Sequence, residues 1–161
     1  MTACVGFTPL YGRSVAGGLA SIETVAPEGR SGYLLREQLD DALGHRAGAP
    51  AAYRLVLSVN ERRFSRGVRL DNTANRFELQ MSVAWRLLDL ETGAEVRKGL
   101  ANTGVTYDSA DQPFAAMIAQ GEGQERAATE VARKIQLELA TWLAHKTSQT
   151  PEPLHGSPVG R

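Results

Sequence analysis

The sequence predicts an α+β fold, a two-layer sandwich in which two helices cover one face of a four-stranded mixed sheet. Two patterns carry this prediction. Apolar and polar residues alternate over residues 77–87, as in a strand with one buried face. Apolar residues recur every three or four positions over residues 128–142, as on a helix with one buried stripe. Because each element has one apolar face, helices packed on one side of a sheet would bury all of them.

The first two predicted elements are a short strand and a helix. Residues 19–25 form the strand, which Pro27 and Gly29 close. Ser31 is the predicted N-cap of the helix, and Gly44 supplies its C-terminal stop. The apolar positions of this helix are Tyr33, Leu35, Leu39 and Leu43. A helix between two strands predicts a right-handed parallel crossover.

Three further strands are expected to pair as antiparallel neighbours. Residues 53–59 alternate with one exception, and residues 77–87 form the clearest strand of the chain. A turn at residues 90–93 leads to a strand over residues 95–107. The alternation of this last strand slips near Gly99, which predicts a bulge there.

A second helix follows the strands, so the predicted element order is β-α-β-β-β-α. Its apolar stripe consists of Ala128, Val131, Ile135, Leu139 and Trp142. We expect the helix to be broken at Gly121-Glu122-Gly123, because each glycine in a helix interior costs about 1 kcal/mol relative to alanine.

The 161 residues are expected to form one domain with tails at both ends. Residues 1–18 are glycine-rich and without pattern, which predicts a tether to an N-terminal anchor. Residues 19–146 form the predicted domain. Residues 147–161 are rich in proline and polar residues, which predicts a disordered tail.

The single cysteine, Cys4, is the predicted site of lipid attachment. It follows the small residues Thr2 and Ala3 and precedes a segment with glycine and proline, residues 5–12. This pattern resembles the processing site of bacterial lipoproteins, in which the cysteine is acylated, although Met1 stands where leucine is usual. Two or more acyl chains would hold a protein durably at a membrane. The alternative interpretation is a small buried thiol near the N-terminus.

Charge and motifs indicate a protein that binds rather than reacts. The chain has 18 basic and 18 acidic residues, which argues against a general nucleic-acid binder. Neither His45 nor His145 has a second ligand at metal spacing, and no nucleophile elbow or phosphate-binding loop is present in the sequence. We therefore expect no enzyme activity, no metal and no cofactor.

An arginine-rich segment between the second and third predicted strands is the candidate binding site. Its arginines are Arg62, Arg63, Arg66, Arg69 and Arg76. Apolar residues are interleaved among them, and residues 71–75 form the predicted turn. Such a hairpin end could hold an anionic amphiphile, such as lipopolysaccharide, through charge-assisted hydrogen bonds. The alternative is an exposed hairpin edge that charge protects against aggregation.

Short motifs along the chain resemble one known family. They lie at residues 4–12, 30–39, 53–55, 73–77, 84–89, 92–93 and 106–108. Together they are similar to the lipopolysaccharide-assembly lipoprotein family, LptE, in its alphaproteobacterial form. The resemblance implies a fold of two helices on a four-stranded sheet and a non-enzymatic role.

The resemblance also implies a location and partners. Members are lipid-anchored in the outer membrane and face the periplasm. They plug the β-barrel of the assembly protein LptD, assist its folding, and with it deliver lipopolysaccharide, which they can bind, to the outer leaflet. The arginine segment is a candidate from its residue pattern alone and is not implied by the resemblance.

Two other functions remain open at the level of sequence. One is a periplasmic lipoprotein that is accessory to an ABC-type lipid transporter. The other is a small hydrolase or sugar-modifying enzyme, which would need a cleft with a perturbed histidine or carboxylate.

Overall fold

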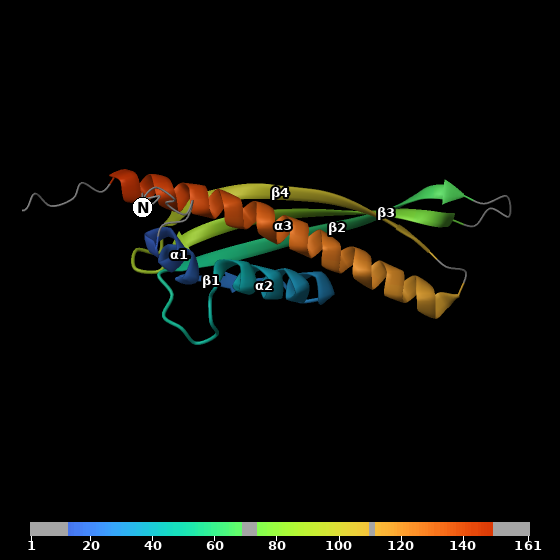
Figure 1. Cartoon of the computed structure of the whole chain (residues 1–161), viewed down its shortest axis with the longest axis horizontal. Coiled ribbons are helices and arrows are strands. Elements are labelled where there is room, and N and C mark those ends of the chain that lie inside the picture. Colours follow the sequence, from blue (N-terminus) through green and yellow to red (C-terminus); the bar gives the residue numbers. More distant parts are fainter. Residues whose placement is uncertain (1–12, 69–73, 110–111, 150–161) are drawn as a thin grey trace, which may run out of the picture.

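The computed structural model describes residues 13–68, 74–109 and 112–149. Its elements are α1 (Arg13–Ala20), β1 (Ile22–Val25), α2 (Arg30–Leu43), β2 (Tyr53–Val68), β3 (Ala74–Asp89), β4 (Glu95–Asp108) and α3 (Pro113–Gln149). Figure 1 shows α3 running diagonally along the sheet with α2 beside it. The predicted α+β fold, with a mixed four-stranded sheet, is confirmed.

The strands lie in the order β1-β2-β3-β4. β1 pairs with β2 in parallel, and the other two pairings are antiparallel. The predicted parallel pairing of the two strands that α2 connects is therefore confirmed. β2 and β3 have 16 residues each, so they are about 50 Å long. β2 was expected to end near Val59 but continues to Val68, and it therefore includes much of the arginine segment.

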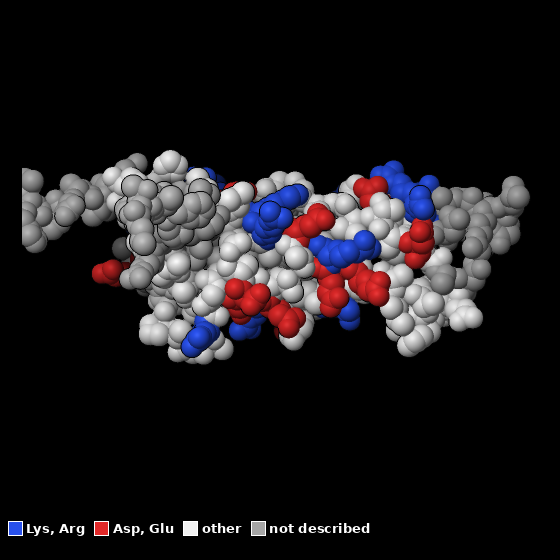
Figure 2. Space-filling view, viewed as in Figure 1, with Lys and Arg blue, Asp and Glu red and all other residues white. Residues whose placement is uncertain are grey.

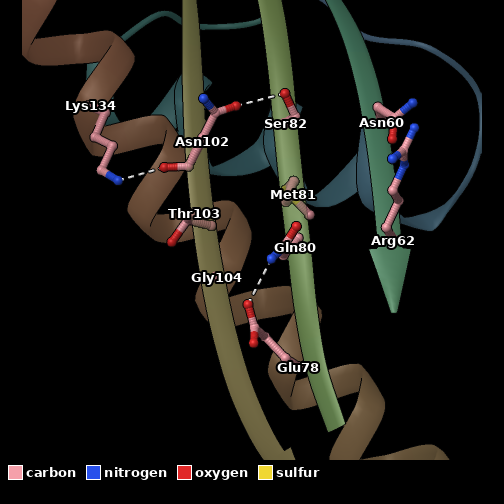
Figure 3. A pocket seen from close by; sticks show the side chains of 10 residues that line it. All are labelled: Asn60, Arg62, Glu78, Gln80, Met81, Ser82, Asn102, Thr103, Gly104 and Lys134. Atoms are coloured by element: carbon pink, nitrogen blue, oxygen red, sulfur yellow. Dashed lines mark hydrogen bonds between the residues drawn. The ribbon is translucent and has the colours of Figure 1, made fainter. Parts of the chain in front are cut away.

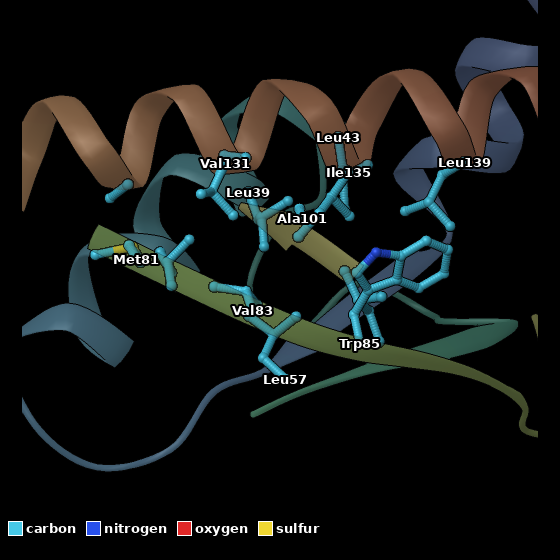
Figure 4. Packing of buried hydrophobic residues seen from close by; sticks show 14 of the residues in the cluster. Leu39, Leu43, Leu57, Met81, Val83, Trp85, Ala101, Val131, Ile135 and Leu139 are labelled. Atoms are coloured by element: carbon cyan, nitrogen blue, oxygen red, sulfur yellow. The ribbon is translucent and has the colours of Figure 1, made fainter. Parts of the chain in front are cut away.

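The core lies between the sheet and the helices, as Figure 4 shows. The predicted alternation of β3 is confirmed, because Leu79, Val83 and Leu87 are fully buried. From the helix side they meet predicted apolar residues, which include Leu39 of α2 and Ile135 of α3. Tyr33, which was also predicted on the apolar stripe of α2, is 67% exposed.

Trp85, 1% exposed, is the largest core side chain, and it explains a glycine. Trp85 lies opposite Gly99 of β4, and a Cβ at Gly99 would be 2.5 Å from Cζ2 of the indole. The bulge predicted at Gly99 is wrong. The register shift lies nearer the start of β4, where Leu87 pairs with Arg97 and Leu88 with Glu95. The sequence irregularity at Gly99 therefore reflects the space that the indole occupies.

Helix α3 runs unbroken for 37 residues through Gly121 and Gly123, so the predicted break is wrong. Each glycine faces a close neighbour. A Cβ at Gly121 would be 2.9 Å from Nη2 of Arg30, and a Cβ at Gly123 would be 3.1 Å from Cδ1 of Tyr107. Packing along the rest of the helix offsets their low helix propensity, since tertiary contacts supply most helical stability.

The N-terminus of α2 also differs from the prediction. Gly29, with φ of 108°, is the N-cap, whereas Ser31 lies in the first turn and donates to Glu61. The predicted C-terminal stop is confirmed, because Gly44 adopts the left-handed conformation with φ of 72°.

The predicted tether and tail need correction where they meet the domain. Residues 13–18 belong to helix α1, in which Val15 and Leu19 are buried. The tether prediction missed this helix because it has eight residues and contributes only these two side chains to the core. At the other end, residues 147–149 continue α3. Residues 1–12 and 150–161, and with them the rest of both predictions, lie outside the described residues.

Two side chains of α3 reach the main chain of β4, an edge strand of the sheet. Nζ of Lys134 donates to the carbonyl oxygen of Asn102 at 2.6 Å. Nη2 of Arg126 donates to the carbonyl oxygen of Thr106 at 3.4 Å. The helix is thus joined to this strand by polar contacts as well as by the core.

Candidate functional site

The arginine segment lies on strand β2 and at the start of β3, and the alternation of the strands divides its side chains between two faces. Arg62 pairs with Gln80 and Arg63 with Leu79 in the β2–β3 register. Because successive side chains point to opposite faces, Arg62 lies on the exposed face and Arg63 on the helix-covered face. The predicted cluster is therefore not a single patch.

Arg63 holds three elements together on the helix side. Its Nη1 donates to Oε1 of Gln120 on α3 at 2.9 Å, and its guanidinium lies 5.1 Å from the ring centroid of Phe77 on β3. Phe77 in turn stacks on Tyr107 of β4, with ring centroids 5.8 Å apart. A cation over an aromatic face is attracted by the ring quadrupole, so Arg63 stabilises this end of the sandwich.

Arg66 and Arg76 form exposed ion pairs. Nε of Arg66 donates to Oε2 of Glu78 at 2.5 Å, and Nε of Arg76 donates to Oδ1 of Asp108 at 2.9 Å. The hydrogen bond from Arg66, helped by one from Gln80, lowers the pKa of Glu78. Exposed pairs of this kind add little to stability. Such pairs are expected under the alternative interpretation of the segment, an exposed hairpin edge that charge protects against aggregation.

Arg76 is expected to control the titration of Asp108. Its hydrogen bond, and secondarily its charge, hold the pKa of Asp108 below its usual value. The pair therefore contributes stability above the ordinary pKa of aspartate, and this contribution is lost as the pH falls through the lowered value. We expect Arg76→Gln to raise the pKa of Asp108, as measured by an NMR pH titration.

Asp89 provides the internal control for this titration. Its lowered pKa comes first from the backbone N–H of Thr92, which lies 3.1 Å from Oδ1. It should therefore not change in Arg76→Gln. An equal shift at Asp89 and Asp108 would contradict the local origin of the effect.

Arg62 lacks such a partner. It forms no hydrogen bond or ion pair within the part of the chain that the structure describes, and it lines a hollow of about 810 Å³ on the exposed face of the sheet. Arg69 and Cys4, the remaining predicted site residues, lie outside the described residues.

A polar contact that the sequence interpretation missed ties β2 to both long helices. Glu61 accepts hydrogen bonds from the hydroxyl of Ser31 on α2 and from Nε2 of Gln124 on α3, the latter at 3.0 Å. Gln124 is 8% exposed, so this contact is largely shielded from water. Strand spacing alone would place Glu61 on the inward face, but only if the strand is extended beyond Val59, where its predicted end lay.

The first turns of α3 expose apolar side chains. Phe114, Met117 and Ile118 are 73%, 70% and 48% exposed. A smaller hollow of about 300 Å³ lies beside them, and its lining includes Met117, Ile118 and Arg30. These residues precede the apolar stripe that predicted the helix, so the sequence interpretation did not include them.

Charges of both signs are interspersed on the helix-covered face, as Figure 2 shows.

Within the described ranges, no group of three histidine, cysteine, aspartate or glutamate residues is placed to hold a metal ion. None of the helices described here is long and apolar enough to span a membrane.

Comparison with known proteins finds likeness among solved structures. No protein-family model and no curated protein matches the chain. The crystal structure of a "putative lipoprotein" from Caulobacter crescentus is 72% identical, with a TM-score of 0.74, and the match covers 86% of this chain and 98% of that one.

More distant structures share the fold alone. A minor lipoprotein from Acinetobacter baumannii has 18% identity and a TM-score of 0.53, and the match covers 74% of this chain and 88% of that one. An uncharacterized lipoprotein B from Nitrosomonas europaea has 13% identity and a TM-score of 0.52, with coverage of 82% and 89%. At 72% identity over nearly the whole length of the relative, the chain belongs to the same lipoprotein family as the Caulobacter crescentus protein.

Proposed function

We propose that this protein is a lipopolysaccharide-assembly lipoprotein. In this role it is anchored to the outer membrane through acylated Cys4, faces the periplasm, and plugs the β-barrel LptD while the pair delivers lipopolysaccharide to the outer leaflet. Membership of a lipoprotein family and the two-layer fold support the proposal. The family resemblance of the sequence supplies the specific partner.

The observation that carries this proposal is the polar central stretch of the exposed face of the sheet, which lies between the exposed side chains of Phe64 and Leu100. β2 is about 50 Å long, and its distal half presents Asn60 and Arg62 to solvent beside Gln80 and Ser82 of β3. The lumen of a large outer-membrane barrel is polar and wet. A plug inside such a lumen needs this kind of surface, whereas an apolar face would be excluded from it.

The same end of the molecule suits an anionic amphiphile. Arg62 offers an unpaired cation on the sheet, and Phe114 and Met117 of α3 offer exposed apolar surface. Lipopolysaccharide combines anionic sugars with acyl chains, so both kinds of contact serve a protein that handles it. This role requires binding alone, and we propose that the protein is not an enzyme.

Co-purification tests the proposal. The native protein, carrying a C-terminal affinity tag and produced at its natural level, is extracted from membranes in mild detergent and captured. We expect a large β-barrel protein in the captured material, identified by mass spectrometry. Recovery with an ATPase and a substrate-binding protein instead would support the accessory role in an ABC-type lipid transporter and overturn the barrel assignment.

The anchor is tested separately with Cys4→Ala. We expect the native protein to carry acyl chains on Cys4 and to sediment with membranes, because two or more buried chains bind durably. The alanine variant should appear in the soluble fraction with the fold retained. An unmodified Cys4 thiol in the native protein would contradict the lipid anchor.

A further inference from the structure

A hollow on the exposed face of the sheet extends across the three strands β2, β3 and β4, as Figure 3 shows. Two rows of side chains form it. In the first, Asn60 of β2 lies opposite Ser82 of β3, which lies opposite Asn102 of β4. The second row consists of Arg62, Gln80 and Gly104. The hollow therefore depends on the register of all three strands.

Small side chains leave the space open. Ser82 occupies the centre of the first row, and Gly104 ends the second. A Cβ at Gly104 would meet only Oε1 of Glu78, at 3.3 Å. No packing constraint requires glycine there, in contrast to Gly99 beneath the indole, and its absent side chain leaves room beside Gln80.

The lining is rich in groups that both donate and accept hydrogen bonds. Ser82 donates to Oδ1 of Asn102 at 2.6 Å, and Gln80 donates to Glu78 at 2.8 Å. The side chain of Asn60 bonds to nothing in the described part of the chain. Each carboxamide has two donor hydrogens and an acceptor oxygen, so unused hydrogen-bond donors and acceptors remain in both rows. Adjacent sugar hydroxyls, which also donate and accept, match such a set.

The accessible charge in the hollow is positive. Arg62 has no anionic partner among the described residues, and Lys134 reaches the rim, where it donates to the carbonyl of Asn102. The carboxylate of Glu78 is already bonded by Arg66 and Gln80. A planar guanidinium binds a carboxylate or phosphate through two parallel hydrogen bonds.

We propose that this hollow binds an acidic oligosaccharide, with a carboxylate or phosphate of the sugar on Arg62 and its hydroxyls on Asn60, Gln80 and Asn102. The sugar would come from the lipopolysaccharide core or from a free acidic oligosaccharide. If the sugar comes from the lipopolysaccharide core, the inference rests on the proposed function. The recognition chemistry is the same for both sources.

The test is an NMR titration of the full, isotope-labelled chain. The probes are trigalacturonic acid and, as a neutral sugar of equal length, maltotriose. We expect trigalacturonic acid to shift the side-chain amide signals of Asn60 and Asn102, and maltotriose to shift them far less. Equal response to the two sugars, or no response at these amides, would overturn the proposal.

Three variants locate the binding. Arg62→Gln should weaken affinity for trigalacturonic acid about tenfold, within the range for a hydrogen bond to a charged group. Arg86→Gln removes the same charge from the same face outside the hollow, and it should bind normally. Gly104→Val should fill the space and abolish binding while the domain stays folded. Binding that falls equally in Arg62→Gln and Arg86→Gln, or that survives Gly104→Val, would overturn the site.

Deacylated lipopolysaccharide core, compared with trigalacturonic acid, identifies the source. Tighter binding of the core, lost in Arg62→Gln, supports the lipopolysaccharide source, and equal binding supports a general acidic sugar. The barrel experiment separates the two proposals. Sugar binding without barrel co-purification would support this site and overturn the proposed function. Barrel co-purification without sugar binding would overturn this site alone.

Discussion

Replacing Trp85 by alanine is expected to lower the free energy of unfolding by about 3–5 kcal/mol, the range for truncating a large buried aromatic residue. The indole is 1% exposed and lies between Leu57 of β2 and Gly99 of β4 in the sheet register. Gly99 has no side chain to fill the space that the indole leaves, so much of the cavity should persist. Equilibrium urea denaturation followed by circular dichroism measures the loss.

Leu100→Ala is the matched control for this experiment. Leu100 follows Gly99 on β4, but its side chain is 59% exposed on the other face of the sheet. We expect its truncation to change stability by less than about 0.5 kcal/mol, as for most surface substitutions. A loss below about 1 kcal/mol in Trp85→Ala would mean that the sheet and helices are not held together at this residue.

Gly32→Ala is expected to lower the free energy of unfolding by about 3 kcal/mol. This value is near the upper end of the range for adding atoms to a well-packed core. Gly32 is buried in the first turn of α2, and an added Cβ would be 2.0 Å from the main-chain oxygen of Pro27. The obstacle is backbone, so relief requires the start of α2 to move. That movement would also disturb the Ser31 contact with Glu61.

Gly17→Ala gives the opposite sign and serves as the control. Gly17 lies in α1 with nothing within 4 Å of the added Cβ. Alanine is favoured over glycine in a helix interior by up to about 1 kcal/mol, so we expect a small gain in stability. The same urea experiment measures both variants. Equal effects in Gly17→Ala and Gly32→Ala would refute the steric argument.

Sequence patterns predicted the elements that bury a regular apolar face. β3 and α3 were predicted because their alternation and helical stripe extend over many residues. The continuity of α3 could not be predicted, because helix propensity is local and the contacts at Gly121 and Gly123 come from α2 and β4. α1 was missed because eight residues carry too little pattern.

The candidate site was less predictable for a related reason. Beyond Val59, most residues of β2 are polar and only Phe64 and Val68 are large and apolar, so no regular apolar alternation signals that the strand continues. Had it been extended, Arg62 and Arg63 would have been assigned to opposite faces from spacing alone. The partners of Arg63 and Arg66, and the hollow beside Arg62, depend on the register of β2 against β3 and β4, which the local pattern does not contain.

The contacts of Lys134 and Arg126 with main-chain oxygens of β4 affect how the molecule behaves among other proteins. The open margin of a sheet is a template on which a foreign strand can add, and aggregation often begins there. A strand arriving along β4 would have to displace both cations before it could reach those oxygens. Addition of a strand at β4 is thereby disfavoured, which limits aggregation through this edge before the protein meets any partner.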